Sequence, residues 1–130
     1  MEAEVTLGLA AAQQRAGSPE QARRNAERAL GSARQAGYRV VEGMALTVLA
    51  RVDLDEGRLP DAVGEAQEAG RIQQECGYRV GLARALVVLG DALRRLGDDA
   101  AAGHWRQADE IFTEVGAAEA AGTADRLAEP

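Results

Sequence analysis

The stretch QAGYRVVEGMALTVLARVDLDEGRL, residues 35–59, returns forty residues later as ECGYRVGLARALVVLGDALRRLGDD, residues 75–99. Both copies carry the same Gly-Tyr-Arg-Val segment, at residues 37–40 and 77–80. Recurrence at a fixed period is the signature of an array of repeated structural units. The period therefore predicts the architecture before any single helix or strand is assigned.

The repeat extends over nearly the whole chain of 130 residues. The residues that recur at steps of forty are Gly17, Gly57 and Gly97, then Leu9, Leu49 and Leu89, and the small residues Ala10, Ala50 and Gly90. The third copy is one residue shorter near 98–102, and with that shift Ala29, Ala69 and Ala108 align. Three copies are expected, at about 1–36, 37–76 and 77–116.

Within each copy the apolar spacing is that of a helix. Leu86, Leu89, Gly90 and Leu93 follow the i, i+3, i+4, i+7 pattern, and in the second copy Asp53 stands at the fourth place as an exception. Each stripe ends at a glycine, a common helix stop, and a second helix follows. No alternating strand pattern is present in the sequence. We expect an all-α chain of three helical hairpins with a capping helix at 117–128.

Small residues predict how the two helices of a hairpin cross. Positions 10, 50 and 90 lie on the first helix, and Ala22, Ala62 and Ala101 are expected opposite them on the second. Alanine or glycine at both places lets helix axes approach to the near end of the usual range of about 8–10 Å.

These residues resemble the tetratricopeptide repeat (TPR). The segment LGDALRRLGDDAAAGHWRQADEIF, residues 89–112, is similar to its signature of Leu-Gly, a later Gly, and Ala, a bulky residue and Ala at Ala101, Trp105 and Ala108. The long period resembles the closing repeats of large bacterial transcriptional regulators, of the Streptomyces antibiotic regulatory protein type and the MalT-like type. The resemblance implies a right-handed superhelical stack. It also implies a single domain, 1–130, from the C-terminal end of a multidomain cytoplasmic regulator.

Composition excludes several classes of function. The net charge is −6, which argues against direct contact with nucleic acid, because phosphate binding needs a basic surface. No stretch is apolar enough to span a membrane. The single cysteine, Cys76, cannot form an internal disulfide and fits a reducing cytosol. All fifteen basic residues are arginines, which is typical of a GC-rich, actinobacterial genome.

The sequence offers little for catalysis or metal binding. His104 and Cys76 fall in different repeats, and no lysine is available for a phosphate loop. The Asp98–Asp99 pair is interpreted as a helix N-terminal cap, and Cys76 as a small buried residue. We expect no enzyme activity, no cofactor and no metal site.

A partner would bind where the first helices of the hairpins line a concave face, as the TPR resemblance implies. Residues four apart share a helix face, and residues forty apart lie on adjacent hairpins, which gives a grid of exposed positions. The candidate partner-binding residues from this grid are Thr47, Arg51, Asp55, Arg84, Val87, Asp91, Arg94 and Arg95. Two interpretations stay open: a solvated helix face with Arg51–Asp55 and Asp91–Arg95 ion pairs, or a true partner groove.

Charge patterning indicates the kind of partner. The first helix of the third copy is rich in arginine, whereas the second helices are acidic, so one end of the concave face is expected to be basic. The expected partner is a protein or an acidic peptide, either separate or part of the same longer chain. Small-molecule sensing and a passive scaffold are the alternative functions.

The two ends of the stack differ. The helix at 117–128 can cap the third hairpin, whereas nothing precedes the first helix, which carries apolar residues on more than one face. We therefore expect the chain to be a fragment of a longer protein. Alone, it is expected to self-associate, most simply as a two-fold dimer through the first hairpin.

Overall fold

The computed structural model describes residues 2–128 and contains seven helices in that range. Their bounds are α1 Glu2–Arg15, α2 Pro19–Ala36, α3 Arg39–Asp55, α4 Leu59–Cys76, α5 Arg79–Arg95, α6 Ala101–Val115 and α7 Ala120–Ala128. No strand is present among the described residues. The all-α, TPR-like stack of three hairpins with a C-terminal helix is confirmed.

Glycines end the second helix of each hairpin. At Gly37 and Gly77 the backbone has φ of 73° and 70°, the left-handed region that a residue without a side chain adopts at little cost. The next residues close the turn, because Tyr38 donates its N–H to Ala33 O and Tyr78 donates to Gln73 O, both at 2.9 Å. Pro60 lies in the first turn of α4, where its missing N–H is not needed.

The expected small columns lie at the helix crossings. Ala10 and Ala22 are fully buried, as are their equivalents Ala50 and Ala62 in the second hairpin. In the third hairpin the pair becomes Gly90 and Ala101, and the indole of Trp105 lies directly on the Gly90 backbone. The alignment of the three copies is therefore correct, and the third hairpin exchanges an alanine for a glycine where a tryptophan needs the space.

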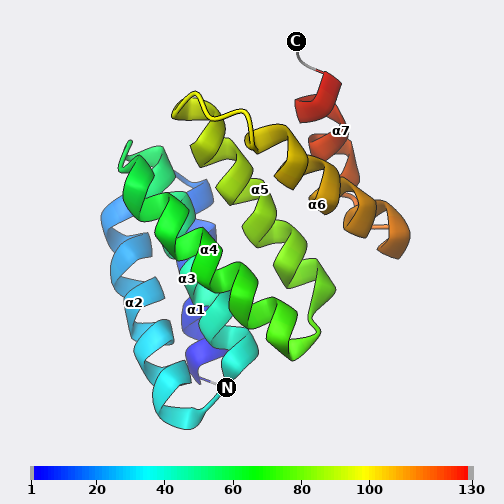
Figure 1. Ribbon diagram of the computed structural model, residues 1–130. Coiled ribbons are helices and arrows are strands. Elements are labelled where there is room, and N and C mark those ends of the chain that lie inside the picture. Colours follow the sequence, from blue (N-terminus) through cyan, green and yellow to red (C-terminus); the bar gives the residue numbers. More distant parts are fainter. Residues whose placement is uncertain (1, 129–130) are drawn as a thin grey trace.

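The hairpins stack in chain order, with α7 at one end. Each helix packs against the next, and in addition α1 packs against α3 and α3 against α5, so the first helices form one layer. Figure 1 shows this succession from the blue α1 to the red α7, with the two chain ends at opposite ends of the stack. This layer of first helices is the surface where the sequence predicts a partner site.

Charged and polar groups join the hairpins to one another. The Arg23 guanidinium on α2 donates to Asp53 Oδ1 at 2.5 Å, and Arg95 on α5 donates to the Leu54 carbonyl at 2.5 Å. Gln14 Nε2 donates to Asp55 Oδ2 at 2.9 Å. Asp53, the exception in the apolar stripe, is therefore a buried anchor for the preceding hairpin.

Within residues 2–128, no helix is long and apolar enough to cross a membrane.

Candidate functional site

A groove of about 980 Å³ runs along the layer of first helices. Its floor is apolar and comes from Leu7 on α1 and from Val41, Met44 and Val48 on α3, which pack on the core of the first two hairpins. The full lining is Glu4, Leu7, Gly8, Ala11, Gln14, Arg15, Val40, Val41, Met44, Thr47, Val48, Arg51, Gln73, Gly81, Arg84 and Glu119. An apolar floor with a few polar groups is typical of a binding site.

Three of the eight candidate residues line this groove, namely Thr47, Arg51 and Arg84. Thr47 Oγ1 donates to the Gly43 carbonyl of its own helix at 3.1 Å, so its methyl group and its oxygen lone pairs remain available. The other five lie outside the lining. The sequence predicts that these five residues lie on an exposed face beside a partner, but the structure places them elsewhere.

Val87 is buried in the core of the third hairpin, with an exposed fraction of 7%. Asp55 is exposed and accepts a hydrogen bond from Gln14 of the preceding hairpin. Arg95 caps the C-terminal end of α3 through the Leu54 carbonyl. The predicted i, i+4 ion pairs do not form, because both Asp55 and Arg95 bind groups on a neighbouring hairpin instead.

Asp91 connects three elements. One oxygen accepts a hydrogen bond from Trp105 Nε1 at 3.1 Å and from Arg126 Nε at 2.7 Å, and the other accepts from Arg126 Nη2 at 3.0 Å. A bidentate arginine–carboxylate pair is among the stronger polar contacts in proteins. Arg94 lies 5.9 Å from the centroid of the Trp105 ring. Trp105 thus packs on α5.

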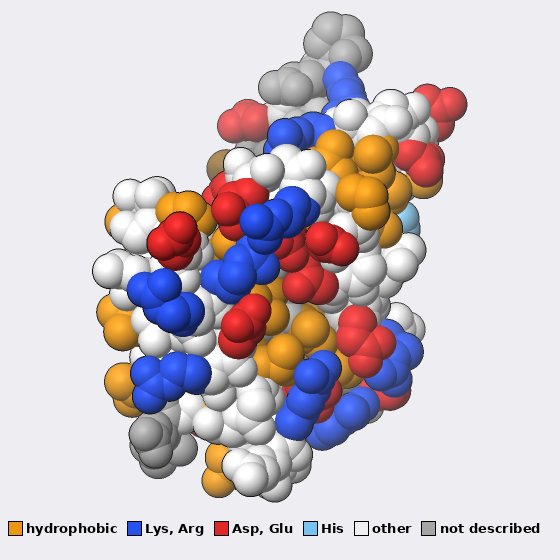
Figure 2. All heavy atoms as spheres, turned by 90° about the vertical axis from the view of Figure 1, so that its left-hand side faces the viewer, with side chains coloured by type: hydrophobic (Ala, Val, Ile, Leu, Met, Phe, Trp, Pro, Cys, Tyr) orange, Lys and Arg blue, Asp and Glu red, His pale blue; other side chains and the backbone are white. Residues whose placement is uncertain are grey.

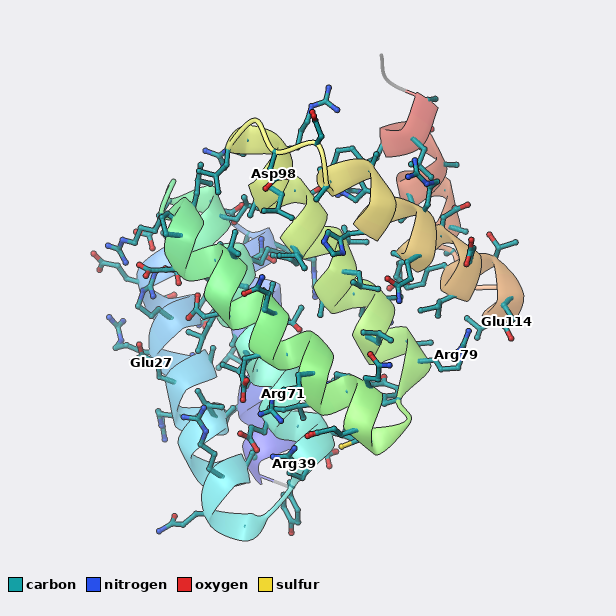
Figure 3. All side chains as sticks on the ribbon, in the orientation of Figure 1. Glu27, Arg39, Arg71, Arg79, Asp98 and Glu114 are labelled. Atoms are coloured by element: carbon teal, nitrogen blue, oxygen red, sulfur yellow. The ribbon has the colours of Figure 1, made fainter. Side chains whose placement is uncertain are left out.

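The third hairpin does not form the basic end that its arginines predict. Arg84 donates to Glu119 at 2.6 Å, and this hydrogen bond raises the pKa of the Arg84 guanidinium. Arg79 and Glu114 point toward each other at the far end of α5 and α6 and pair at 2.5 Å (Figure 3). On the face shown in Figure 2, acidic and basic side chains alternate, with apolar surface between them. Carboxylates from α6 and the segment before α7 therefore pair with two of the four arginines that the sequence places on α5.

Arg51 differs from the other groove arginines. It is half-buried, and no carboxylate lies within ion-pair distance of it among the described residues. Burial lowers the pKa of its guanidinium, and the more distant carboxylates of Asp91 and Asp55 only partly oppose that effect. A cation that is partly removed from water without a direct partner is an incomplete electrostatic arrangement. An anion placed in the groove beside Arg51 would complete it.

Gln73 lines the groove from α4, and sequence reasoning missed it. Its side chain is fully buried, and its Oε1 atom has no hydrogen-bond partner among the described residues. The sequence contained a signal for this residue, because Gln73 is polar whereas the equivalent positions in the other copies are the apolar Ala33 and Phe112.

The remaining candidates for chemistry lie apart from the groove. Cys76 is exposed at the end of α4, so its interpretation as a buried residue is wrong. Asp98 Oδ1 accepts the N–H of Ala100 at 2.8 Å, one residue before α6, so it stabilises the turn instead of capping the helix itself. No group of three or more His, Cys, Asp or Glu side chains in residues 2–128 is arranged to hold a metal ion.

A second polar cluster lies beside Pro60 and Asp61, between the first two hairpins. Burial, followed by the hydrogen bond with Asp53, raises the pKa of Glu65 to about 8. Burial alone would also raise the pKa of Asp53, but hydrogen bonds from Glu65 and Arg23 outweigh it and lower that pKa. Glu65 therefore carries a proton at neutral pH and shares it with the ionised Asp53.

This shared proton predicts a pH-dependent stability. Unfolding lowers the pKa of Glu65 from about 8 to its ordinary value of 4.5, so the folded chain binds the extra proton between these values. The free energy of unfolding should fall as the pH rises through this window. The slope should stay below about 1.4 kcal/mol per pH unit, the value for one proton, because solvent screens a partly exposed group.

Urea unfolding between about pH 5 and pH 9, which covers most of this window and extends about one unit beyond its upper end, measures this slope. Glu65→Gln keeps a hydrogen-bond donor beside Asp53 and removes the titration, so its stability should be flat over the same range. Glu110→Gln, at an exposed position of α6, is the control and should keep the slope of the unmodified chain. An identical pH slope in Glu65→Gln would show that another group is responsible.

Known proteins resemble this chain in fold. No family model matches it, and no curated protein matches it in sequence. Among solved structures, the crystal structure of the apo form of RapI superposes with a TM-score of 0.82 at 20% identity, over 97% of this chain. The chain spans only 36% of that structure's length. At this identity the likeness shows a shared helical-repeat fold, and a fold does not by itself fix a function.

Proposed function

We propose that this chain is a non-catalytic protein-interaction module whose groove binds an acidic peptide segment of a partner. The segment would place apolar side chains on the floor formed by Leu7, Val41, Met44 and Val48, and a carboxylate beside Arg51. Burial of apolar area would provide most of the affinity, and the charge would set orientation and specificity.

The observation that carries this proposal is the half-buried Arg51, which has no ion-pair partner among the side chains described, those of residues 3–128, and lies in a groove with an apolar floor. Arg84 and Arg15 lie on the same lining and add positive charge, although Glu119 already occupies Arg84. A carboxylate is the complementary group, because a guanidinium binds it with two parallel hydrogen bonds.

The place of the module in a larger protein rests on the sequence resemblance. We propose that it is the C-terminal repeat domain of a multidomain bacterial transcriptional regulator that works in the cytoplasm. The acidic segment then belongs either to another protein or to the regulator's own upstream domains. In the second case, binding in the groove would report on the arrangement of the whole regulator.

Small-molecule sensing is the second candidate function, and the groove volume favours it. About 980 Å³ lies at the upper end of the range of about 300–1,000 Å³ for small-molecule sites. An acidic effector of moderate size would use Arg51 in the same way. The two functions differ in how affinity depends on ligand length, because a peptide would use the apolar floor from α1 to α3.

Selection from a random peptide library with the chain as bait tests the proposal. We expect the selected sequences to combine aspartate or glutamate with large apolar residues. Selection of basic or purely apolar sequences would contradict it. A shuffled version of each selected peptide, with the same composition, is the control for nonspecific charge attraction.

The first hairpin is proposed as a self-association surface of the isolated chain. Val5 and Leu9 lie one turn apart on α1 and are 73% and 51% exposed. Replacing both by aspartate should convert dimers to monomers in sedimentation velocity at micromolar concentration, because burying a carboxylate in an apolar interface is unfavourable. Val115→Asp, at an exposed apolar residue of α6, should leave association unchanged. A monomeric unmodified chain would contradict the proposed dimer.

A further inference from the structure

Three positions of the repeat change together at one place on the groove wall. The first is Gln73, which stands where the other copies have Ala33 and Phe112, and all three of these residues are buried. A fully buried glutamine in a column that elsewhere holds alanine or phenylalanine is unfavourable unless its amide is used.

The other two changes make room for this amide. Gly43 stands where the other copies have Ala3 and Ala83, and Gly81 stands where the second copy has Val41. A Cβ at Gly43 would lie 2.6 Å from Gln73 Cδ. A Cβ at Gly81 would lie 3.0 Å from the same atom and closer still to the Tyr78 ring, at 2.5 Å from its Cδ2, so Gly81 makes room for both side chains. Both α3 and α5 therefore have a glycine, which has no side chain, where they contact the Gln73 amide.

Hydrogen bonding fixes the direction of the amide but leaves it incomplete. Gln73 Nε2 donates to the Val40 carbonyl at 3.0 Å, and this contact distinguishes the nitrogen from the oxygen. Oε1 is buried and has no partner among the described residues. An oxygen of this kind has lost its hydrogen bonds to water without replacement, which is a recognised cost in folded proteins.

We propose that Gln73 Oε1 is a hydrogen-bond subsite of the groove that accepts one amide N–H from the bound peptide, after the side chain turns toward the groove from the fully buried position that the structure shows. This inference rests on the proposed function, because Gln73 lines the same groove as Arg51. The donor is a neutral amide, since Val40 and Val41 make the surroundings apolar and an ammonium group would lose its hydration there. The subsite binds an N–H of the peptide backbone or of an amide side chain, whereas Arg51 binds the carboxylate.

A small probe tests the subsite without the natural ligand. N-methylacetamide carries one amide N–H, and N,N-dimethylacetamide has nearly the same shape but no N–H. In the chain labelled with ¹³C at glutamine, we expect N-methylacetamide to shift the Gln73 Cδ resonance downfield in a saturable way. N,N-dimethylacetamide should produce no saturable shift. The exposed Gln67 on the same helix is the internal control and should change only linearly with either compound.

Equal responses of Gln73 to the two amides, or no saturable response, would overturn the subsite. An ordered water on Oε1 that the probe does not displace gives this second outcome. A saturable, N–H-dependent shift combined with failure of the peptide selection would contradict the proposed function and leave the amide subsite standing. Successful peptide selection without the shift would support the proposed function and overturn the amide subsite.

A stability measurement provides the second arm. Gln73→Met keeps the length and flexibility of the side chain and removes the orphaned oxygen, so we expect its urea midpoint to shift upward. Gln67→Met, at the exposed position, should leave the midpoint unchanged. A downward shift for Gln73→Met would mean that the amide serves the fold through Val40, and the subsite would be rejected.

Discussion

Gly90→Ala should lower the free energy of unfolding by about 1–3 kcal/mol, even though alanine is the better helix former. A Cβ at this position would lie 2.4 Å from Trp105 Nε1, 2.5 Å from Trp105 Cδ1 and 3.2 Å from the Ala101 carbonyl oxygen. The indole is buried and donates to Asp91, so it cannot move aside without breaking that bond. The strain therefore spreads to the contact between α5 and α7.

Gly64→Ala is the matched control, because Gly64 is also helical but has nothing within 4 Å of the added Cβ. Relief of the glycine penalty should stabilise this variant by about 0.5–1 kcal/mol. Urea unfolding of both variants measures the difference, which should have opposite signs in the two cases. A Gly90→Ala variant as stable as Gly64→Ala would show that the packing of Trp105 on α5 is wrong.

Arg51→Met should weaken binding of the selected acidic peptides by about 10- to 100-fold, since a hydrogen bond to a charged group contributes about 1.5–3 kcal/mol. The fold should survive, because methionine fills the apolar part of the site and no ion pair among the described residues is lost. Isothermal titration calorimetry gives the affinity, and circular dichroism checks the helical content. Removing a half-buried cation without a direct partner should also leave the thermal midpoint equal or higher.

Arg28→Met is the control for the loss of one positive charge. Arg28 is exposed on α2 and lies outside the groove lining. Its affinity for the same peptides should stay within a factor of about two, because an exposed charge contributes little. Equal losses for the two variants would mean that net charge, and not the groove, determines binding.

The repeat made the architecture predictable from the sequence. Small residues at Ala50 and Ala62 leave one way for two helices to cross, and glycines such as Gly37 end helices wherever the left-handed backbone is needed. These are short-range constraints that recur in each copy of the repeat. A pattern that occurs three times identifies the crossing positions more securely than a single occurrence, and the structure confirms the three hairpins.

The partners of the long polar side chains were not predictable in the same way. Asp55 and Arg51 are four residues apart on one helix, yet Asp55 binds Gln14 from another hairpin. Arginine reaches several Å from its helix, and the superhelix brings groups into range that are forty residues apart. The choice among these partners is worth only a fraction of a kcal/mol at the surface, so spacing alone does not decide it.

Departures from the repeat were the informative signal for the groove. Position 87 copies the spacing of Thr47 but lies in the core, because α6 and the start of α7 cover that part of α5. Gln73, in contrast, breaks an apolar column and reaches the groove. Polar residues that stand at the core positions of a repeat are visible in the aligned copies alone, and both Gln73 and Asp53 are of this kind.

Chemical-shift mapping with one selected acidic peptide tests the central claim most directly. The labelled chain is titrated with the peptide, and the backbone amide shifts are assigned to helices. We expect the largest changes on the groove side of α1, α3 and α5, centred on Thr47, Arg51 and Gly81, and we expect Arg51→Met to remove them. Changes confined to the outer faces of α2, α4 and α6, or a map that Arg51→Met leaves intact, would contradict the account.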